Sequence, residues 1–333
     1  MKRLDPSILE ELYAHPAGYV SGQKLAHRLG LTRAAVWKQV EALRAQGYDI
    51  EASPRRGYRL RGVPDLLLPE EVARALGRSG PTTIRWRVVY RRQVGSTNEV
   101  AKELAVQGAP EGTVVLAEEQ LAGRGRLGRD WSSPPGVGVW TTLLLRPSLP
   151  PLACAPITLV TAVAVADAIE HATGLKVGIK WPNDLLLGGR KVCGVLTELA
   201  AEMERLSYLV VGIGLNVNQT SVELGPDLER RATSLRLESG APVHRVSLLA
   251  QLLVDFDRAY ASFLRGGFPP LREHWRKRSI TLGSQVRALG PAGIVEGVAV
   301  DVDVEGGLVV ETAGGSRQIV RSGEVTTARR AGG

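Results

Sequence analysis

The stretch Gly123–Trp131, GRGRLGRDW, follows a run of strand-forming residues that ends at Gln120. Glycine lets backbone N–H groups come close to an anion, and arginine donates paired hydrogen bonds to phosphate or carboxylate oxygens. The order differs from a GxGxxG turn, and the Lys-Ser/Thr pair of a P-loop is absent. An RGG-like nucleic-acid segment or a flexible basic turn would share this composition. Because the stretch lies between two predicted strands, the sequence favours a specific anionic ligand.

The residues around this loop predict a mixed α/β domain. Short apolar runs typical of strands alternate with helical patterns. The pair Gly188–Gly189 suits the two-residue turn of a hairpin. The predicted strands are Ile84–Tyr90, Thr113–Glu118, Val137–Leu145, Asp184–Leu187, Val192–Leu199 and Leu209–Asn216, and the predicted helices lie near Asn98–Val106 and Thr158–Ala172.

A second polar segment, Lys180–Asp184 (KWPND), joins a strand end to the predicted hairpin, and Lys191 stands at the start of the returning strand. Proline, asparagine and aspartate suit turns, and Trp181 could simply be a core residue, so the segment alone is also consistent with a structural turn. Together with the Gly/Arg loop and the strand lysine, it indicates a binding site.

The N-terminal residues predict a winged helix-turn-helix. Helical apolar spacing at Ser7–Tyr13 is followed by Ser21–Leu29 and Leu31–Gly47, which are separated by a Gly-containing turn. Ser21 and Thr32 are the expected N-caps. Tyr48–Arg61 predicts two short strands around a basic turn. A small three-helix packing module that never touches DNA is the alternative.

Charge is concentrated in this head. Residues 1–63 contain 11 Lys/Arg and 6 Asp/Glu, which gives +5 of the chain's net +8. Such asymmetry favours a polyanionic partner, although a solvated basic surface has the same composition. Phosphate contacts would position the head, and residues near the helix start would reach base edges. The residues expected to contact DNA are Thr32, Arg33, Trp37, Lys38, Arg55 and Arg56.

The remaining sequence predicts a linker at Gly62–Glu70, a helix at Pro69–Leu76, a charged helix at Leu249–Ser279 and a small C-terminal β-barrel. We therefore predict three domains, residues 1–63, 64–278 and 279–330. The barrel strands are expected at Gln285–Leu289, Ile294–Val304, Leu308–Thr312 and Arg317–Val320.

Composition predicts a cytoplasmic protein without a membrane partner. The longest apolar stretch, around Pro156–Ile169, is expected to be too short to span a bilayer, and it contains Asp167. The two cysteines, Cys154 and Cys193, belong to no CxxC or Cys/His cluster, so we expect reduced packing residues rather than a disulfide or a zinc site.

Five motifs in the same order resemble those of the biotin–protein ligase family: GSTN (95–98), QxxGRGRxGRxW (120–131), KWPND (180–184), KxxGxLxE (191–198) and GxGxN (212–216). With the head and the barrel, the resemblance covers essentially the whole chain and is closest to the bifunctional ligase/biotin-operon repressor type. It implies an α+β protein with a winged helix-turn-helix, a central domain of the class II aminoacyl-tRNA synthetase/biotin ligase type, and an SH3-like β-barrel.

The resemblance implies that biotin and ATP, with Mg²⁺, form biotinyl-5′-AMP, and that a lysine of the biotin carboxyl carrier protein of acetyl-CoA carboxylase then takes the biotin. Arg126, Lys191 and Asp184 would be catalytic. No metal ligand is firmly assigned. The residues implied to bind biotin or adenylate are Ser96, Thr97, Asn98, Gln120, Arg124, Gly125, Arg126, Trp131, Lys191, Gly194 and Asn216. For some of these residues a structural role is the alternative: Ser96 as a helix cap, Lys191 as an exposed strand residue, Asp184 and Asn216 as turn residues, and Trp131 as a core residue.

The repressor type also implies operator DNA as a partner and a ligand-promoted homodimer. The segment after Asn216, which covers the nucleotide in the family, contains no aromatic residue here, and position 127 is Leu where some relatives have Arg. These departures bear on how ligand binding couples to dimerisation. The alternatives are a ligand-sensing transcription factor without ligase activity and a lipoate-type ligase; an inactive DNA-binding head is the converse case.

Overall fold

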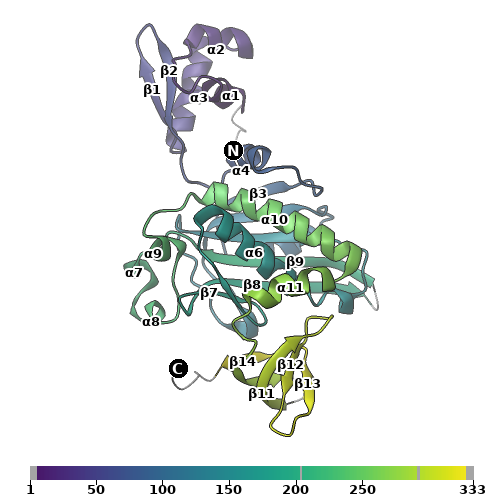
Figure 1. The fold of residues 1–333 in the computed structure, drawn as a ribbon. Helices are drawn as coiled ribbons and strands as arrows, with labels where there is room; N and C mark the ends of the chain where they lie inside the picture. Colours follow the sequence, from purple (N-terminus) through teal and green to yellow (C-terminus); the bar gives the residue numbers. More distant parts are fainter. Residues whose placement is uncertain (1–5, 203–204, 291–292, 328–333) are drawn as a thin grey trace. The chain divides into compact units, whose positions relative to one another are not determined.

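A computed structural model describes residues 6–202, 205–290 and 293–327 and divides the chain into two compact units, Met1–Leu66 and Leu67–Gly333 (Figure 1). We call the first unit the head and the second the body. The predicted division into residues 1–63, 64–278 and 279–330 stays a prediction.

The head contains the predicted winged helix-turn-helix. Ser21 accepts a hydrogen bond from the backbone of Lys24, and Thr32 accepts one from Ala35, so both expected N-caps are confirmed. Gly30 ends the second helix in a left-handed conformation. The elements are α1 (Pro6–Tyr13), α2 (Gly22–Leu29), α3 (Arg33–Ala45), β1 (Asp49–Ser53) and β2 (Gly57–Gly62), with the two strands antiparallel.

The body is built on a seven-stranded sheet with the strand order β3-β4-β5-β9-β8-β7-β6. β3 and β4 are parallel and the other neighbours are antiparallel. The strands are β3 (Arg87–Val94), β4 (Thr113–Gln120), β5 (Gly138–Leu145), β6 (Gly178–Lys180), β7 (Asp184–Leu187), β8 (Arg190–Glu202) and β9 (Arg205–Asn216). The turn glycines 188 and 189 both have positive φ, as the predicted hairpin requires.

The strand predicted at Ile84–Tyr90 is shifted in the structure to Arg87–Val94. The backbone N–H groups of Thr83 and Ile84 donate to the buried carboxylate of Asp257, at 2.9 and 2.7 Å, rather than to a neighbouring strand. The chain therefore joins the sheet only at Arg87, and its pairing with β4 continues to Val94.

Helices cover the two faces of the sheet unequally (Figure 1). One face packs against α4 (Pro69–Ser79), α6 (Ile157–Thr173), α10 (Arg245–Gly266) and α11 (Pro269–Arg278), and the other packs against α5 (Thr97–Val106). Along β4, Val114 and Leu116 belong to the first core, and Val115 belongs to the second, as the two-residue period of a strand requires.

The single helix predicted at Leu249–Ser279 is wrong. The chain forms two helices, since Gly267 has positive φ and two prolines follow Phe268, and neither feature permits a continuous helix. The first helix, α10, is also less exposed than its charge suggested, because fourteen of its residues are buried.

Residues Pro151–Thr173 form a helical stretch that is long and apolar enough to cross a membrane by length and composition alone. The expectation that this stretch is too short is therefore wrong, because the short helix η2 (Pro151–Cys154) runs into α6. In the structure, 72% of its apolar window is buried inside the protein. The stretch is thus a central helix of the core.

The C-terminal residues form a separate five-stranded antiparallel sheet with the order β13-β12-β11-β10-β14. Its last strand, β14, was not expected from the sequence, and it pairs with β10. The strands are β10 (Gln285–Gly290), β11 (Gly293–Val302), β12 (Leu308–Glu311), β13 (Arg317–Val320) and β14 (Glu324–Thr327). Three short helices after Asn216 were also missed: α7 (Ser221–Leu224), α8 (Pro226–Glu229) and α9 (Leu235–Ser239).

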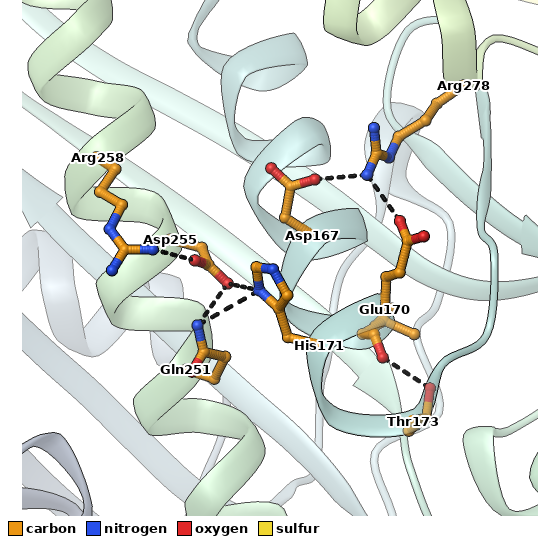
Figure 2. A network of polar contacts seen from close by, with 9 residues as sticks. Asp167, Glu170, His171, Thr173, Gln251, Asp255, Arg258 and Arg278 are labelled. Carbon is orange, nitrogen blue, oxygen red and sulfur yellow. Dashed lines mark hydrogen bonds and ion pairs between the residues drawn. The ribbon is translucent and has the colours of Figure 1, made fainter. Parts of the chain in front are cut away.

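A polar network joins α6 to α10 and to the end of α11 (Figure 2). Arg278 contacts the carboxylates of Asp167 at 2.6 Å and Glu170 at 2.8 Å. Asp255, which is buried, lies 3.0 Å from His171 Nδ1. Burial raises the pKa of Asp167 above its usual value, while the Arg278 guanidinium lowers it. The Arg278 contacts therefore offset the cost of burying a carboxylate between helices.

Replacing Arg278 with alanine should lower the free energy of unfolding by about 1–2 kcal/mol at pH 7, because Asp167 then lies partly buried without its cation. The raised pKa sets the pH window: the loss is full where Asp167 is ionised, and it shrinks as the carboxyl takes up a proton, which happens at a higher pH than for an ordinary aspartate. Urea unfolding at pH 7 and at a pH low enough to protonate Asp167 measures this. The exposed Arg265→Ala is the matched control, and an equal loss at both pH values would contradict the account.

Candidate active site

A small cavity of about 50 Å³ lies where the start of α5 meets β4, β8 and β9. Its walls contain most of the residues that the motifs predicted: Ser96, Thr97, Asn98, Gln120, Arg124, Gly125, Arg126, Trp131, Lys191 and Gly194. The first three are 94% or more buried. Motifs about 100 residues apart in sequence therefore form one pocket.

Hydrogen bonds hold the polar walls of this pocket in fixed orientations. Gln120 Oε1 accepts from the backbone N–H and the hydroxyl of Thr97, at 2.8 and 3.0 Å, while its Nε2 donates to Ser133 at 2.8 Å. Asn98 Nδ2 donates to Glu198 at 2.7 Å, and the Thr142 hydroxyl lies 2.6 Å from Asn98 Oδ1. These side chains are thus preorganised for a polar ligand.

A larger cavity of about 550 Å³ adjoins the small one and contains Asp184 and Asn216, the two predicted residues that the small cavity lacks. Five residues line both cavities: Gly125, Arg126, Trp131, Asn183 and Lys191. The two cavities are therefore lobes of one site, a small polar lobe and a large lobe, with two cations at their junction.

The two cations at the junction, Lys191 and Arg126, differ in whether a carboxylate pairs with them. Lys191 Nζ lies 2.7 Å from Asp184 Oδ1. Arg126 is partly buried, its guanidinium donates to Asn183 Oδ1 at 3.3 Å, and among the described residues it has no ion pair. Burial lowers the pKa of Arg126, and the charges of Asp184 and Glu324 raise it from a distance. Arg126 is thus a desolvated cation that favours an incoming anion.

Trp131 lies against the backbone of the sheet and forms a wall of both lobes. A Cβ atom on Gly214 would lie 2.5 Å from Trp131 Nε1, and one on Gly194 would lie 3.0 Å from the same ring. Gly194 and Gly214 are cross-strand partners on β8 and β9. Lys191 Nζ is 4.9 Å from the centre of the indole ring, within the range of a cation–π contact.

Arg124 and Asn216 have additional contacts, whereas the side chain of Ser96 does not cap its helix. Arg124 Nη2 forms an ion pair with Glu99 at 2.5 Å, although the side chain also lines the small lobe. Ser96 is the N-cap residue of α5, but its side chain makes no capping hydrogen bond. Asn216 Nδ2 donates to the carbonyl of Thr233 at 3.0 Å.

The segment 217–243, which we call the strap, lies beside Lys191. The Lys191 N–H donates to the carbonyl of Arg231, and the Thr233 N–H donates to the carbonyl of Lys191, at 2.8 and 2.9 Å. Leu224 and Leu228 line the large lobe. The strap thus supplies aliphatic walls in place of the aromatic residue that the sequence lacks.

The sequence reasoning missed several wall residues. Asn183 lies inside the quoted KWPND motif, and Gly212 and Gly214 lie inside GxGxN, where a Cβ on Gly212 would overlap the amide of Asn98. Arg129 and Glu324, from the Gly/Arg loop and β14, form an ion pair at the wall of the large lobe. No sequence signal pointed to Glu324, because its strand was not predicted.

Trp181 is a core residue, which confirms the alternative given for it in the sequence analysis. It is 98% buried, and its Nε1 donates to the carbonyl of Gly306 at 3.0 Å, while its backbone N–H donates to Thr281. The barrel therefore holds the KWPND turn that carries Asn183 and Asp184. Both cysteines are buried and free, as expected.

In the head, the side chains proposed for DNA contact are exposed. Thr32, Arg33, Trp37 and Lys38 begin α3 on its outer face, and Arg55 and Arg56 form the turn between β1 and β2. Trp37 is 55% exposed, and the Arg56 guanidinium stacks 4.1 Å from the Tyr19 ring centre. This arrangement suits the insertion of a helix into a groove.

Within residues 6–202, 205–290 and 293–327, no group of three or more His, Cys, Asp or Glu side chains is placed to hold a metal ion. Asp184 and Glu324 are each paired with a cation at the wall of the large lobe.

The fold and the two-lobed site define a chain with a winged helix-turn-helix head and a body whose pocket suits an anionic ligand. Three family models match the chain in order: the HTH domain at residues 7–59, the biotin/lipoate A/B protein ligase family at 89–216, and the biotin protein ligase C-terminal domain at 281–326.

Known proteins are similar to this chain over most of its length. The bifunctional ligase/repressor BirA of Bacillus spizizenii is 40% identical over 93% of this chain and 95% of its own length. The biotin–[acetyl-CoA-carboxylase] ligase of Mycobacterium tuberculosis is 35% identical over 71% and 87%. The structure of the biotin protein ligase from Aquifex aeolicus in complex with biotin and ATP has a TM-score of 0.64 at 31% identity, covering 73% of this chain and 99% of that one. The chain belongs to the bifunctional biotin ligase/repressor family.

Substituting Gly214 with alanine should lower the free energy of unfolding by about 1–3 kcal/mol, because the new Cβ overlaps the indole of Trp131. The cost should largely disappear in a Trp131→Ala background, which a double-mutant cycle in urea measures. Gly77→Ala, where nothing lies within 4 Å in the helix α4, is the control and should be neutral or stabilising. A cost that persists without Trp131 would show that the glycine is needed for another reason.

Proposed function

We propose that this protein joins biotin to ATP in the two-lobed site, forming biotinyl-5′-AMP, and then transfers biotin to a lysine of the biotin carboxyl carrier protein of acetyl-CoA carboxylase. The observation that carries the proposal is the junction of the lobes, where Arg126 and Lys191 face both cavities. A carboxylate in the small lobe and an α-phosphate in the large lobe would meet between these two cations.

In the first half-reaction, a biotin carboxylate oxygen attacks the α-phosphorus, the bond to the bridging oxygen breaks, and pyrophosphate leaves. Arg126 donates hydrogen bonds to the oxygens that gain charge, and Lys191 neutralises the charge between carboxylate and phosphate. Ser96, Thr97, Asn98 and Gln120 would bind the ureido end. Arg124 would join the carboxylate after leaving Glu99, while Gly125 and Gly194 keep the wall thin.

In the second half-reaction, the carrier lysine attacks the acyl carbon of the mixed anhydride, and AMP leaves. We propose that Asp184 accepts the proton from the incoming amine, because it lines the large lobe and is paired with Lys191 at the junction. Trp131 would wall the adenylate, and Asn216 would support the nucleotide side. ATP would enter as its Mg²⁺ complex, with the phosphates as the principal ligands of the ion.

For the head, we propose recognition of operator DNA by the start of α3 and the basic turn at Arg55–Arg56. Two heads would meet a palindromic operator in a homodimer that the adenylate promotes, and the protein would act in the cytoplasm. The support is the exposed basic surface of a winged helix-turn-helix together with family membership.

Purified protein should catalyse biotin-dependent exchange of labelled pyrophosphate into ATP. Arg126→Ala and Lys191→Ala should each lower kcat/KM by about 10²–10³, because each removes a donor to the charge that develops at phosphorus. Exposed Arg85→Ala and Lys176→Ala, on the same body, are the matched controls and should retain full activity.

Three results would contradict the enzymatic proposal. Loss of activity in the controls as well would place the effect in overall charge rather than at the junction. Exchange that depends on lipoate instead of biotin would favour a lipoate-type ligase. DNA binding without adenylate formation under any condition would favour a ligand sensor.

Lys38→Ala and Arg55→Ala should each weaken binding to a duplex selected from a random library by the wild type with biotin and ATP. Each should also reduce the slope of log K against log salt by about one, since one phosphate contact is lost. Exposed Arg78→Ala, outside the head, is the charge-matched control. A slope unchanged by either head substitution would assign DNA contact to another surface.

A further inference from the structure

Gln219, at the start of the strap, has a buried acceptor without a partner. The residue is 1% exposed and lines the large lobe. Its Nε2 donates to Asn216 Oδ1 at 3.0 Å, but its Oε1 has no hydrogen-bond partner among the residues that the structure describes. A buried carbonyl oxygen left unpaired is costly, so this atom has the character of a ligand contact.

The orientation of this amide follows from its neighbours. The carbonyl of Thr233 can only accept, so the atom of Asn216 that faces it must be Nδ2. The other end of Asn216 is then an acceptor, and the atom of Gln219 that faces it must be Nε2. Oε1 is consequently left as the free end, and it can pair only with a donor.

The backbone holds Gln219 firmly in this position. The hydroxyl of Ser234 donates to the Gln219 carbonyl at 2.7 Å, and the neighbouring Asn218 is bound to Val137 and to both backbone groups of Val243. The acceptor is therefore presented by a rigid frame, which is what selective recognition requires.

The surroundings indicate which donor it meets. Leu224 and Leu228 line the same lobe and suit the flat faces of a base. The phosphates would lie beside Arg126 and Lys191, the two cations that line this lobe. Within the nucleotide, the donor that lies on the base is the exocyclic amine of adenine, whereas a 6-oxopurine presents an acceptor there.

We propose that Gln219 Oε1 accepts a hydrogen bond from the 6-amino group of adenine and makes the large lobe selective for 6-aminopurine nucleotides. The inference rests on the proposed function, since it concerns the nucleotide of that reaction. Gln219 is a specificity-determining residue that touches the base and takes no part in the bond changes at phosphorus.

The test is biotin-dependent pyrophosphate exchange with ATP, with purine riboside triphosphate, which lacks the amine, and with ITP. The wild type should prefer ATP to purine riboside triphosphate about tenfold or more in kcat/KM. Gln219→Met, which keeps the length of the side chain, should bring this ratio close to one. If Gln219→Met only weakened the support of Asn216, it would lower kcat/KM for both nucleotides together and leave their ratio unchanged.

Leu228→Ala is the control in the same lobe: it should lower kcat/KM for both nucleotides alike. An unchanged ratio in Gln219→Met, or a wild-type ratio near one, overturns the inference, and the wild-type measurement decides it even where the variant does not fold. The inference is also overturned if Gln219→Met instead changes the ratio of kcat/KM between ATP and 2′- or 3′-deoxy-ATP, because the acceptor then binds the ribose. Biotin-dependent exchange that is absent with every nucleotide overturns the proposed function as well.

Discussion

The packing of Trp131 on Gly194 and Gly214 is the constraint on which the site depends. These glycines are cross-strand partners, and the same row of the sheet continues to Asp184 on one side and Trp140 on the other. The row presents a floor without side chains at its centre, and the indole closes over it. Because the Gly/Arg loop is thereby fixed to the sheet, Arg126 and Lys191 come to face the same junction although they lie far apart in the sequence.

The electrostatic balance at this junction favours a negatively charged ligand. Asp184 compensates Lys191 directly, whereas Arg126 is desolvated and, within the described part of the chain, contacts only the neutral Asn183. If Asp184 were also paired with Arg126, an incoming anion would have to break that ion pair before it could bind the guanidinium. An arginine that is already partly desolvated and held by a neutral amide donates to an anion without that cost, which favours electrostatic catalysis.

The sequence predicted what depends on local signals and short motifs. The caps at Ser21 and Thr32, the Gly188–Gly189 hairpin and the residues around both lobes followed from turn chemistry and from ordered motifs. Features that depend on distant partners did not follow. Asp257 removes Ile84 from the sheet, and β14 brings Glu324 to the large lobe by pairing with β10. No periodicity within such segments reports those contacts.

The backbone hydrogen bonds of the strap explain how the segment can be ordered without an aromatic residue. An aromatic side chain that stacks on a nucleotide gives its segment an extra contact when the ligand is bound. Here Arg231 and Thr233 of the strap are hydrogen-bonded to the backbone of Lys191, Arg236 is bonded to Val217 within the strap, and the side chain of Leu235 is buried. Contacts within the protein thus already offset most of the conformational entropy that the strap loses on ordering. Ligand binding then has less conformational entropy to remove from this segment, so the ordering of the strap contributes less to any coupling between the adenylate and assembly.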